Sequence, residues 1–114
     1  MPLLSIQTNI ALNASRQREL LHSLSSTTAE MLGKPERYVM VCLQTESSML
    51  FAGTDAPLAY VELKSLGLPE NRTAEFSTRL CEVIHLEAGI SPDRIYLEFS
   101  AAERHMWGWD GRTF

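Results

Sequence analysis

The chain has few basic residues and few cysteines. The first argues against binding to nucleic acids and acidic membranes, and the second against a metal site. Lys and Arg total 10 against 14 Asp and Glu, so the net charge is -4 and no basic surface for phosphates is expected. We therefore expect neither nucleic acid nor an acidic membrane as a partner. Cys42 and Cys81 lie far apart and form no C-x-x-C motif, which predicts no metal site. We interpret both as small hydrophobic residues of the core.

Long apolar segments are also missing. No stretch approaches the roughly 18 residues that a membrane-spanning helix needs, and no basic segment followed by a long apolar run opens the chain. We expect a cytosolic protein, with secretion by a route other than a signal peptide left open. Phosphate-binding glycine motifs are absent, and no cofactor is expected. A composition of 45% hydrophobic and 21% charged residues is typical of one globular domain over residues 1–114.

The chain does have a proline directly after Met1. Removal of Met1 would give Pro2 a free secondary amine, a nitrogen base that no side chain supplies. An ordinary α-amino group has a pKa of about 7.7 to 8.0, and burial lowers it. Such an amine can act as a base at neutral pH. The competing interpretation is a proline merely tolerated at the start of a strand, and Pro2 alone would favour it.

An internal repeat divides the domain into halves at about residues 1–50 and 57–105. Each half contains a proline, an acid and an arginine that lead into an apolar strand pattern. These are Pro35-Glu36-Arg37 in the first half and Pro92-Asp93-Arg94 in the second. Because the matching segments occur in the same order, we interpret the halves as two copies of one supersecondary unit.

One helical pattern lies between the strands of each half, where hydrophobic residues recur at spacings near three and four. Ser15 is predicted to cap the start of the first helix, and Asn71 or Thr73 the start of the second. Gly33 and Gly89 are predicted to end the two helices, because glycine takes the left-handed conformation easily. Each half is therefore predicted to be a β-α-β unit.

A β-α-β unit places its strands parallel, and the right-handed crossover puts both helices on one face of the sheet. Residues 38–43 form a continuous apolar run, which is typical of a strand buried on both faces. The helices can cover only one face. We therefore expect a large apolar surface on the other face, covered by further copies of the chain in a homo-oligomer.

Short motifs along the whole chain match one known family in order. They are Met1-Pro2, Thr8-Asn9, Gly33-Lys34-Pro35, Phe51-Ala52-Gly53, Ser65-Leu66-Gly67, Asn71-Arg72, Ser91 to Tyr96, Gly108-Trp109 and Thr113-Phe114. The chain thereby resembles the macrophage migration inhibitory factor family of the tautomerase superfamily. The resemblance implies an α+β fold in which two β-α-β repeats form a four-stranded mixed sheet with two helices on one face. It also implies a homotrimer around a central barrel, with pockets at the subunit interfaces.

The resemblance implies keto-enol tautomerisation of phenylpyruvate-like or dopachrome-like compounds, with Pro2 as the catalytic base. Lys34 matches a pocket lysine that binds the substrate carboxylate or stabilises enolate charge. Without the resemblance, Lys34 is equally a solvated cation near a helix C-terminus. Leu66 matches a position whose main-chain amide holds the substrate, and a packing leucine is the alternative. A protein partner is compatible with the family but nothing in the residues indicates one.

Aromatic side chains would complete the implied pocket. Tyr96 matches a tyrosine supplied by a neighbouring subunit, and Trp109 and Phe114 match an aromatic wall. Trp107 stands where the family usually has a small aliphatic residue, so it would narrow the pocket. Ordinary strand or interface packing is the alternative for these side chains. Glu98 replaces the asparagine of well-known members and would repel an anionic ligand, so we expect an altered or weaker substrate preference.

Three functional hypotheses follow. The leading one is a tautomerase of an enolisable keto acid that uses Pro2 as base and Lys34 as electrostatic anchor. The second is a cytokine-like protein-binding module that retains the pocket as a relic. The third is hydration or dehalogenation of an unsaturated acid, with Glu98 activating water and Pro2 acting as an acid. The third chemistry usually needs additional arginines in the pocket, and the sequence alone places none there.

Overall fold

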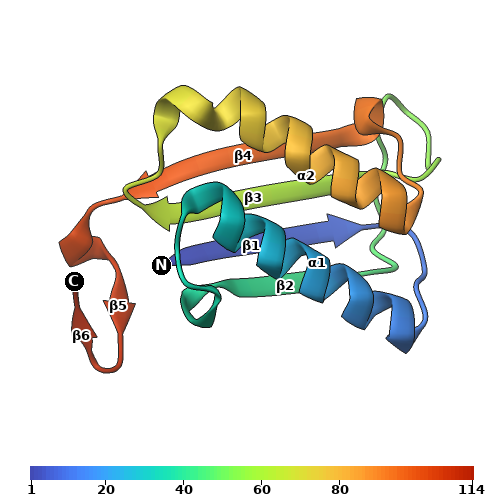
Figure 1. Ribbon diagram of the computed structural model, residues 1–114. Helices are drawn as coiled ribbons and strands as arrows, with labels where there is room; N and C mark the ends of the chain where they lie inside the picture. The colour runs from blue at the N-terminus through green and yellow to red at the C-terminus, as the bar shows by residue number, and fades with distance from the viewer.

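The computed structural model describes all residues from 1 to 114, and its elements alternate strands with helices (Figure 1). The first half consists of β1 (Pro2–Thr8), α1 (Ala14–Leu32), the 3-10 turn η1 (Glu36–Tyr38) and β2 (Met40–Gln44). The second half consists of β3 (Ala59–Leu66), η2 (Glu70–Arg72), α2 (Thr73–Ala88), η3 (Pro92–Arg94) and β4 (Ile95–Ala102). The chain ends with η4 (Arg104–Met106) and the short strands β5 (Gly108–Trp109) and β6 (Arg112–Thr113).

The four long strands form one mixed sheet in the order β2-β1-β3-β4. β1 is parallel to β2 and β3 is parallel to β4, while β1 and β3 pair antiparallel in the centre. Pro2 lies opposite Ser65 in this central pair. Both helices cover the same face of the sheet (Figure 1). The predicted α+β class, with a four-stranded mixed sheet and two helices on one face, is confirmed.

The hydrophobic core lies between the sheet and the two helices. Every second residue of β1 and of β3 is buried, because successive side chains of a strand point to opposite faces. The helices contribute residues spaced three and four apart, the period of one helix face. The largest fully buried hydrophobic side chains are Leu4, Leu20, Leu24, Val61, Leu63, Phe76, Leu80, Ile84 and Ile90. No helix of the chain combines the length and apolar character that a membrane span requires.

The ends of the helices agree with the sequence pattern. Gly33 and Gly89 follow α1 and α2 with φ angles of 61° and 69°, in the left-handed region that glycine adopts without a steric penalty. The amide of Lys34 then donates to the carbonyl of Ala29 at 3.0 Å. This closure turns the chain away from the helix axis and fixes the backbone on which Lys34 is carried.

The predicted starts of the helices are wrong. Asn13, rather than Ser15, caps α1, because its side-chain oxygen accepts from the amide of Arg16 at 2.8 Å. Asparagine and serine are about equally good caps, so residue type alone did not decide between them. Helix α2 has Arg72 at its cap position and no side-chain cap bond, so Asn71 and Thr73 do not have the predicted role.

The sheet face opposite the helices is more polar than expected. Its apolar side chains include Leu3, Met40, Cys42 and Leu66, and they are outnumbered by Ser5, Gln7, Gln44, Tyr60, Glu62, Lys64, Tyr96 and Glu98, at the alternate positions that the core does not use. The expectation of a large apolar surface is therefore wrong. In β2 only Val41 and Leu43 pack against the core, whereas Met40 is 62% exposed and Cys42 is exposed.

β2 is an edge strand, and this position explains why its side chains are exposed. β2 pairs only with β1, so its outer side and its face opposite the helices have no neighbour within the chain. The prediction that residues 38–43 are buried on both faces does not hold for the single chain. The assignment of Cys42 to the core is also wrong, while Cys81 is half-buried and packs against the core.

Candidate functional site

A cavity of about 500 Å³ opens at the end of the sheet where β1 begins. Its walls come from the N-terminus, the turn after α1, the end of β3 and the C-terminal segment. The lining residues are Met1, Lys34, Tyr38, Leu66, Gly67, Arg104, Trp109 and Phe114. Figure 1 shows both ends of the chain at this end of the molecule. A volume of this size is typical of a site for a small organic molecule.

The α-amine of Met1 lies at this cavity, and its pKa is lower than that of an ordinary α-amine. The pKa of the Met1 amine is lowered from 8.0 to about 6, first by burial and then by the positive charge and hydrogen bond of Lys34. An amine with this pKa is mostly neutral at pH 7 and can accept a proton. The next residue, Pro2, is buried at the head of β1. Removal of Met1 would make the Pro2 nitrogen the α-amine of this region.

Lys34 is held in place by the end of β3. Its Nζ donates to the main-chain oxygen of Leu66 at 2.6 Å, across 32 positions of sequence. A carbonyl oxygen carries no net charge, so this bond fixes the position of the Lys34 Nζ without forming an ion pair. The structure thus brings Lys34 and Leu66 together. The contact uses the Leu66 carbonyl, whereas the resemblance assigned a role to the Leu66 amide.

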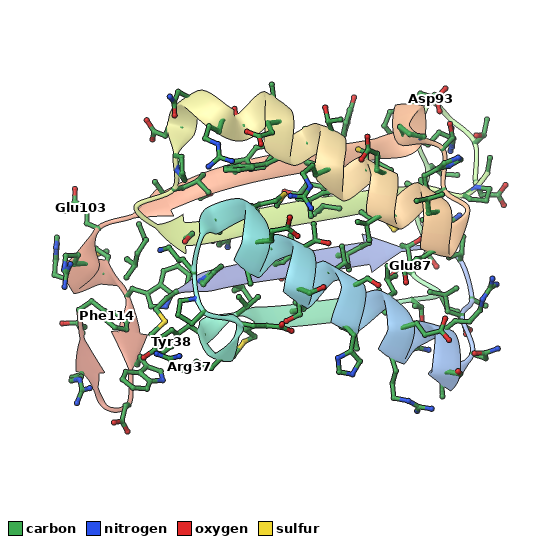
Figure 2. The ribbon with its side chains drawn as sticks, viewed as in Figure 1. Arg37, Tyr38, Glu87, Asp93, Glu103 and Phe114 are labelled. Atoms are coloured by element: carbon green, nitrogen blue, oxygen red, sulfur yellow. The ribbon has the colours of Figure 1, made fainter.

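Aromatic rings form one wall of the cavity. The ring of Trp109 stacks on Phe114, with centroids 6.1 Å apart and planes 14° apart. Trp109 also meets Tyr38 edge to face at a centroid distance of 6.0 Å. In Figure 2, Tyr38 and Phe114 lie at the same end of the molecule, and Glu87 and Asp93 lie toward the opposite end. Such a wall suits a planar apolar group.

Trp107 does not line the cavity, but it anchors the chain end. Its main-chain oxygen accepts from the amide of Phe114 at 3.3 Å. The carbonyl of Arg104 accepts from the same amide at 3.1 Å. The segment from η4 to β6 is therefore tied back on itself, and the tie sets the position of Phe114 in the wall.

Besides Trp107, the sequence-derived site residues Tyr96 and Glu98 do not line this cavity. Tyr96 pairs with Tyr60, while Ala101 pairs with Ser65, the residue opposite Pro2. Five residues of strand separate these two levels, a distance of about 17 Å. Tyr96 is 66% exposed, and its ring packs edge to face on Phe51 at 4.8 Å. The cavity of a single chain therefore lacks Tyr96.

Glu98 also lies on β4, on the sheet face opposite the helices. Its carboxylate accepts a hydrogen bond from the hydroxyl of Tyr60 at 2.6 Å. This bond is the main reason that the pKa of Tyr60 is raised well above its ordinary value. Glu98 forms no ion pair with Lys34 in the chain. Within one chain, Glu98 does not line the cavity, so it could repel an anionic ligand only in the cavity of a neighbouring subunit.

Sequence reasoning missed four of the lining residues. Tyr38 and Gly67 each lie within a few positions of a predicted site residue, and that proximity was the available signal. For Met1 the sequence predicts only removal from the chain. Arg104 belongs to η4, which has no recognisable pattern, and its place in the wall depends on how the C-terminal segment folds back. The arginine that the third hypothesis required is thus present at the cavity.

A second hollow, of about 370 Å³, lies on the sheet face opposite the helices. It is lined by Ser5, Ile6, Gln7, Cys42, Leu43, Gln44, Tyr60 and Glu62. None of these side chains is basic, so this hollow offers nothing to bind a carboxylate. No group of three or more His, Cys, Asp or Glu side chains is arranged to hold a metal ion. The cavity at the head of β1 is therefore the better candidate site for an organic acid.

Comparison with known proteins gives consistent matches over the whole chain. The family model described as Macrophage migration inhibitory factor (MIF) matches residues 1–114. The macrophage migration inhibitory factor of Meriones unguiculatus is 34% identical over 117 residues, covering 100% of this chain and 99% of that protein. The crystal structure of a homologue from Prochlorococcus marinus has a TM-score of 0.92 and 45% identity, over 98% of each chain. The factor from Trichinella spiralis has a TM-score of 0.91 and 30% identity, over 98% of this chain and 99% of that one.

Proposed function

The chain belongs to the macrophage migration inhibitory factor family, and from this premise we propose that it is a keto-enol tautomerase of phenylpyruvate-like acids. Dopachrome-like compounds would serve as artificial substrates. The observation that carries the proposal is the place of the amino terminus beside Lys34 in a cavity with an aromatic wall, where burial and Lys34 lower the pKa of the Met1 amine to about 6. A base works best when its pKa lies near the working pH.

In the proposed mechanism, loss of Met1 makes the Pro2 nitrogen the base. The neutral amine removes a proton from the carbon beside the keto group, and the electrons of that C–H bond form the C=C bond of the enol. The π electrons of the carbonyl group move to its oxygen, which takes up a proton from water, and the protonated amine releases its proton to water, so no atom is gained or lost overall. In the reverse direction the protonated amine returns a proton to carbon.

The other residues of the cavity have matching roles in the proposal. Lys34 binds the substrate carboxylate or stabilises the negative charge that develops on the enolate oxygen. Its bond to the Leu66 carbonyl fixes the cation before the substrate arrives, so less reorganisation is needed during the reaction. The ring of the substrate lies against Trp109 and Phe114, which form a flat apolar surface.

The proposal includes a homotrimer in which a neighbouring subunit contributes to each site. Tyr96 is two-thirds exposed on edge strand β4, so a second copy can reach it. Tyr96 of one subunit would then complete the cavity of the next, and its hydroxyl would donate to the substrate. Glu98 lies two residues further along the same strand, and its bond to Tyr60 occupies one of its oxygens.

Arg104 gives some support to the third hypothesis, hydration or dehalogenation, because that chemistry needs a cation in addition to Lys34. It also needs a carboxylate that can activate water beside Pro2. The cavity is lined by no acidic side chain, and Glu98 is engaged with Tyr60 on the sheet face opposite the helices. Tautomerisation needs no such carboxylate, and we therefore favour it.

Intact-mass measurement combined with a phenylpyruvate assay tests the proposal. We expect the processed protein, without Met1, to interconvert the keto and enol forms, which ultraviolet absorbance follows. The Pro2→Gly variant keeps an amino terminus but replaces the secondary amine by a primary one, so we expect at least a tenfold loss of kcat/KM with the oligomer intact. A form that retains Met1 serves as the control: its Pro2 nitrogen is an amide and cannot act as the base, so we expect kcat/KM to fall. A processed and folded parent without turnover would contradict the proposal and favour the protein-binding module.

A further inference from the structure

The cavity has two cationic side chains and no acidic one, although the whole chain has a net charge of -4. Lys34 and Arg104 line it, and none of the five ion pairs in the structure includes either residue. The sequence neighbour of Arg104, Glu103, lies 3.5 Å from His105 instead. Neither positive charge therefore has a side-chain carboxylate as an ion-pair partner within the chain.

The two cations are carried by separate parts of the fold. Lys34 extends from the turn after α1 and is bound to the Leu66 carbonyl. The backbone of Arg104 is fixed by two hydrogen bonds to its carbonyl, from Phe114 at 3.1 Å and from Trp107 at 3.3 Å. The aromatic wall of Trp109 and Phe114 belongs to the same C-terminal segment as Arg104. A planar ligand on this wall thus has access to cations from two different segments.

One carboxylate, as in phenylpyruvate, requires only one of these cations. An unpaired guanidinium at a binding cavity attracts a further anion, because it presents several donors in a planar fork that fits carboxylates. We infer that the cavity selects planar aromatic acids with two anionic groups, one bound by Lys34 and the other by Arg104. The inference rests on the same site as the proposed function and names the class of substrate that the site prefers.

Binding of two matched, unreactive ligands tests the inference without requiring turnover. Cinnamate carries one carboxylate, and 4-carboxycinnamate adds a second at the far end of the ring. Trp109 lines the cavity and is one of only two tryptophans, so quenching of tryptophan fluorescence reports binding. We expect the parent protein to bind 4-carboxycinnamate roughly tenfold more tightly than cinnamate at low salt, and this ratio should fall as salt is added.

Arg104→Gln should reduce the ratio of the two affinities to about one, because it weakens the binding of 4-carboxycinnamate far more than the binding of cinnamate. Arg18→Gln is the matched control, because Arg18 is an exposed arginine in the first turns of α1. Its substitution removes the same charge from the molecule. The control should keep the parent ratio. Equal affinities in the parent, or the same loss in Arg18→Gln, would overturn the inference.

Phenylpyruvate turnover measured on the same samples separates this inference from the proposed function. A protein that prefers the dianion but does not turn over phenylpyruvate would contradict only the tautomerase. A protein that turns over phenylpyruvate but binds both ligands equally would contradict only the dianion preference.

Discussion

At the scale of single residues, Lys34 helps to lower the pKa of the Met1 amine, and the contacts of Lys34 explain how it does so. Burial has the largest effect, and the positive charge of Lys34 comes next. Lys34 exerts this effect because Gly33 ends α1 immediately before it and the Leu66 carbonyl holds its Nζ. The resemblance could indicate Lys34 from the sequence. It could not indicate the bond to Leu66, since that contact depends on the packing of the first β-α-β unit against the second.

Glu98 allows a prediction at the same scale. Replacement by Gln removes the negative charge that accepts the Tyr60 proton, so the Glu98→Gln variant should have a lower pKa for Tyr60 than the parent. Ultraviolet titration of the three tyrosines measures this change. The parent should have one tyrosine that ionises later than the others, and Tyr60→Phe identifies it by removing that phase. A late phase that persists unchanged in Glu98→Gln would show that the carboxylate is not its cause.

At the scale of elements, hydrophobic periodicity and glycines predicted the two helices and their ends. The starts were harder to predict because Asn13 and Ser15 are both good caps, and only the folded backbone selects between them. The strand β2 was misjudged for another reason. Its apolar sequence is typical of a central strand, but the order of the strands makes it an edge strand, and strand order is a property of the whole sheet.

Arg94 binds the long connection before β3, and we predict that its loss lowers the stability of the protein. Its guanidinium donates to the carbonyls of Phe51, Thr54, Ala56 and Pro57 at 3.0 to 3.2 Å. We expect Arg94→Ala to lower the free energy of unfolding by roughly 2 to 3 kcal/mol, because several carbonyls lose a charged donor. Urea denaturation measures this difference.

Arg79→Ala is the control for Arg94, since Arg79 forms a single exposed ion pair with Glu30 at 3.4 Å. Its loss should change the free energy of unfolding by less than about 1 kcal/mol. Arg94→Lys should fall between the two, because an ammonium cannot reach four carbonyls in one plane. Equal stability of the Arg94→Ala and Arg79→Ala proteins would mean that the connection does not depend on this arginine.

At the scale of the whole molecule, the sheet face opposite the helices bears on assembly. The sequence suggested that a large apolar surface would require covering, but the face is largely polar. The proposal of a trimer therefore rests on the family and on the cavity of a single chain, which lacks the exposed Tyr96. Sequence patterns identify which residues share a face, but they do not reveal whether that face meets water or a polar interface.

Subunit complementation tests the shared site. Pro2→Gly and Tyr96→Ala should each be poorly active alone, because each removes one contributor to every pocket. When the two are mixed, unfolded and refolded together, about a quarter of the pockets in random trimers should combine an intact Pro2 with an intact neighbouring Tyr96. Activity should return toward that fraction, and ultracentrifugation should give a trimer. A monomer, or a mixture no more active than its components, would contradict the shared pocket.

The pH dependence of kcat/KM for phenylpyruvate most directly tests the central claim that a buried α-amine is the catalytic base. A base must be neutral to accept a proton, so activity should fall about tenfold per pH unit below its pKa and level off above it. We expect the Pro2 nitrogen to share the burial and the cation that lower the Met1 amine pKa to about 6, which places the half-maximal rate near that pH. Lys34→Ala should move this midpoint to higher pH, because the cation that disfavours protonation is gone. A profile without an ionisation between pH 5 and 8, or a kcat/KM that does not fall in Pro2→Gly, would contradict the assignment of the amine as the base.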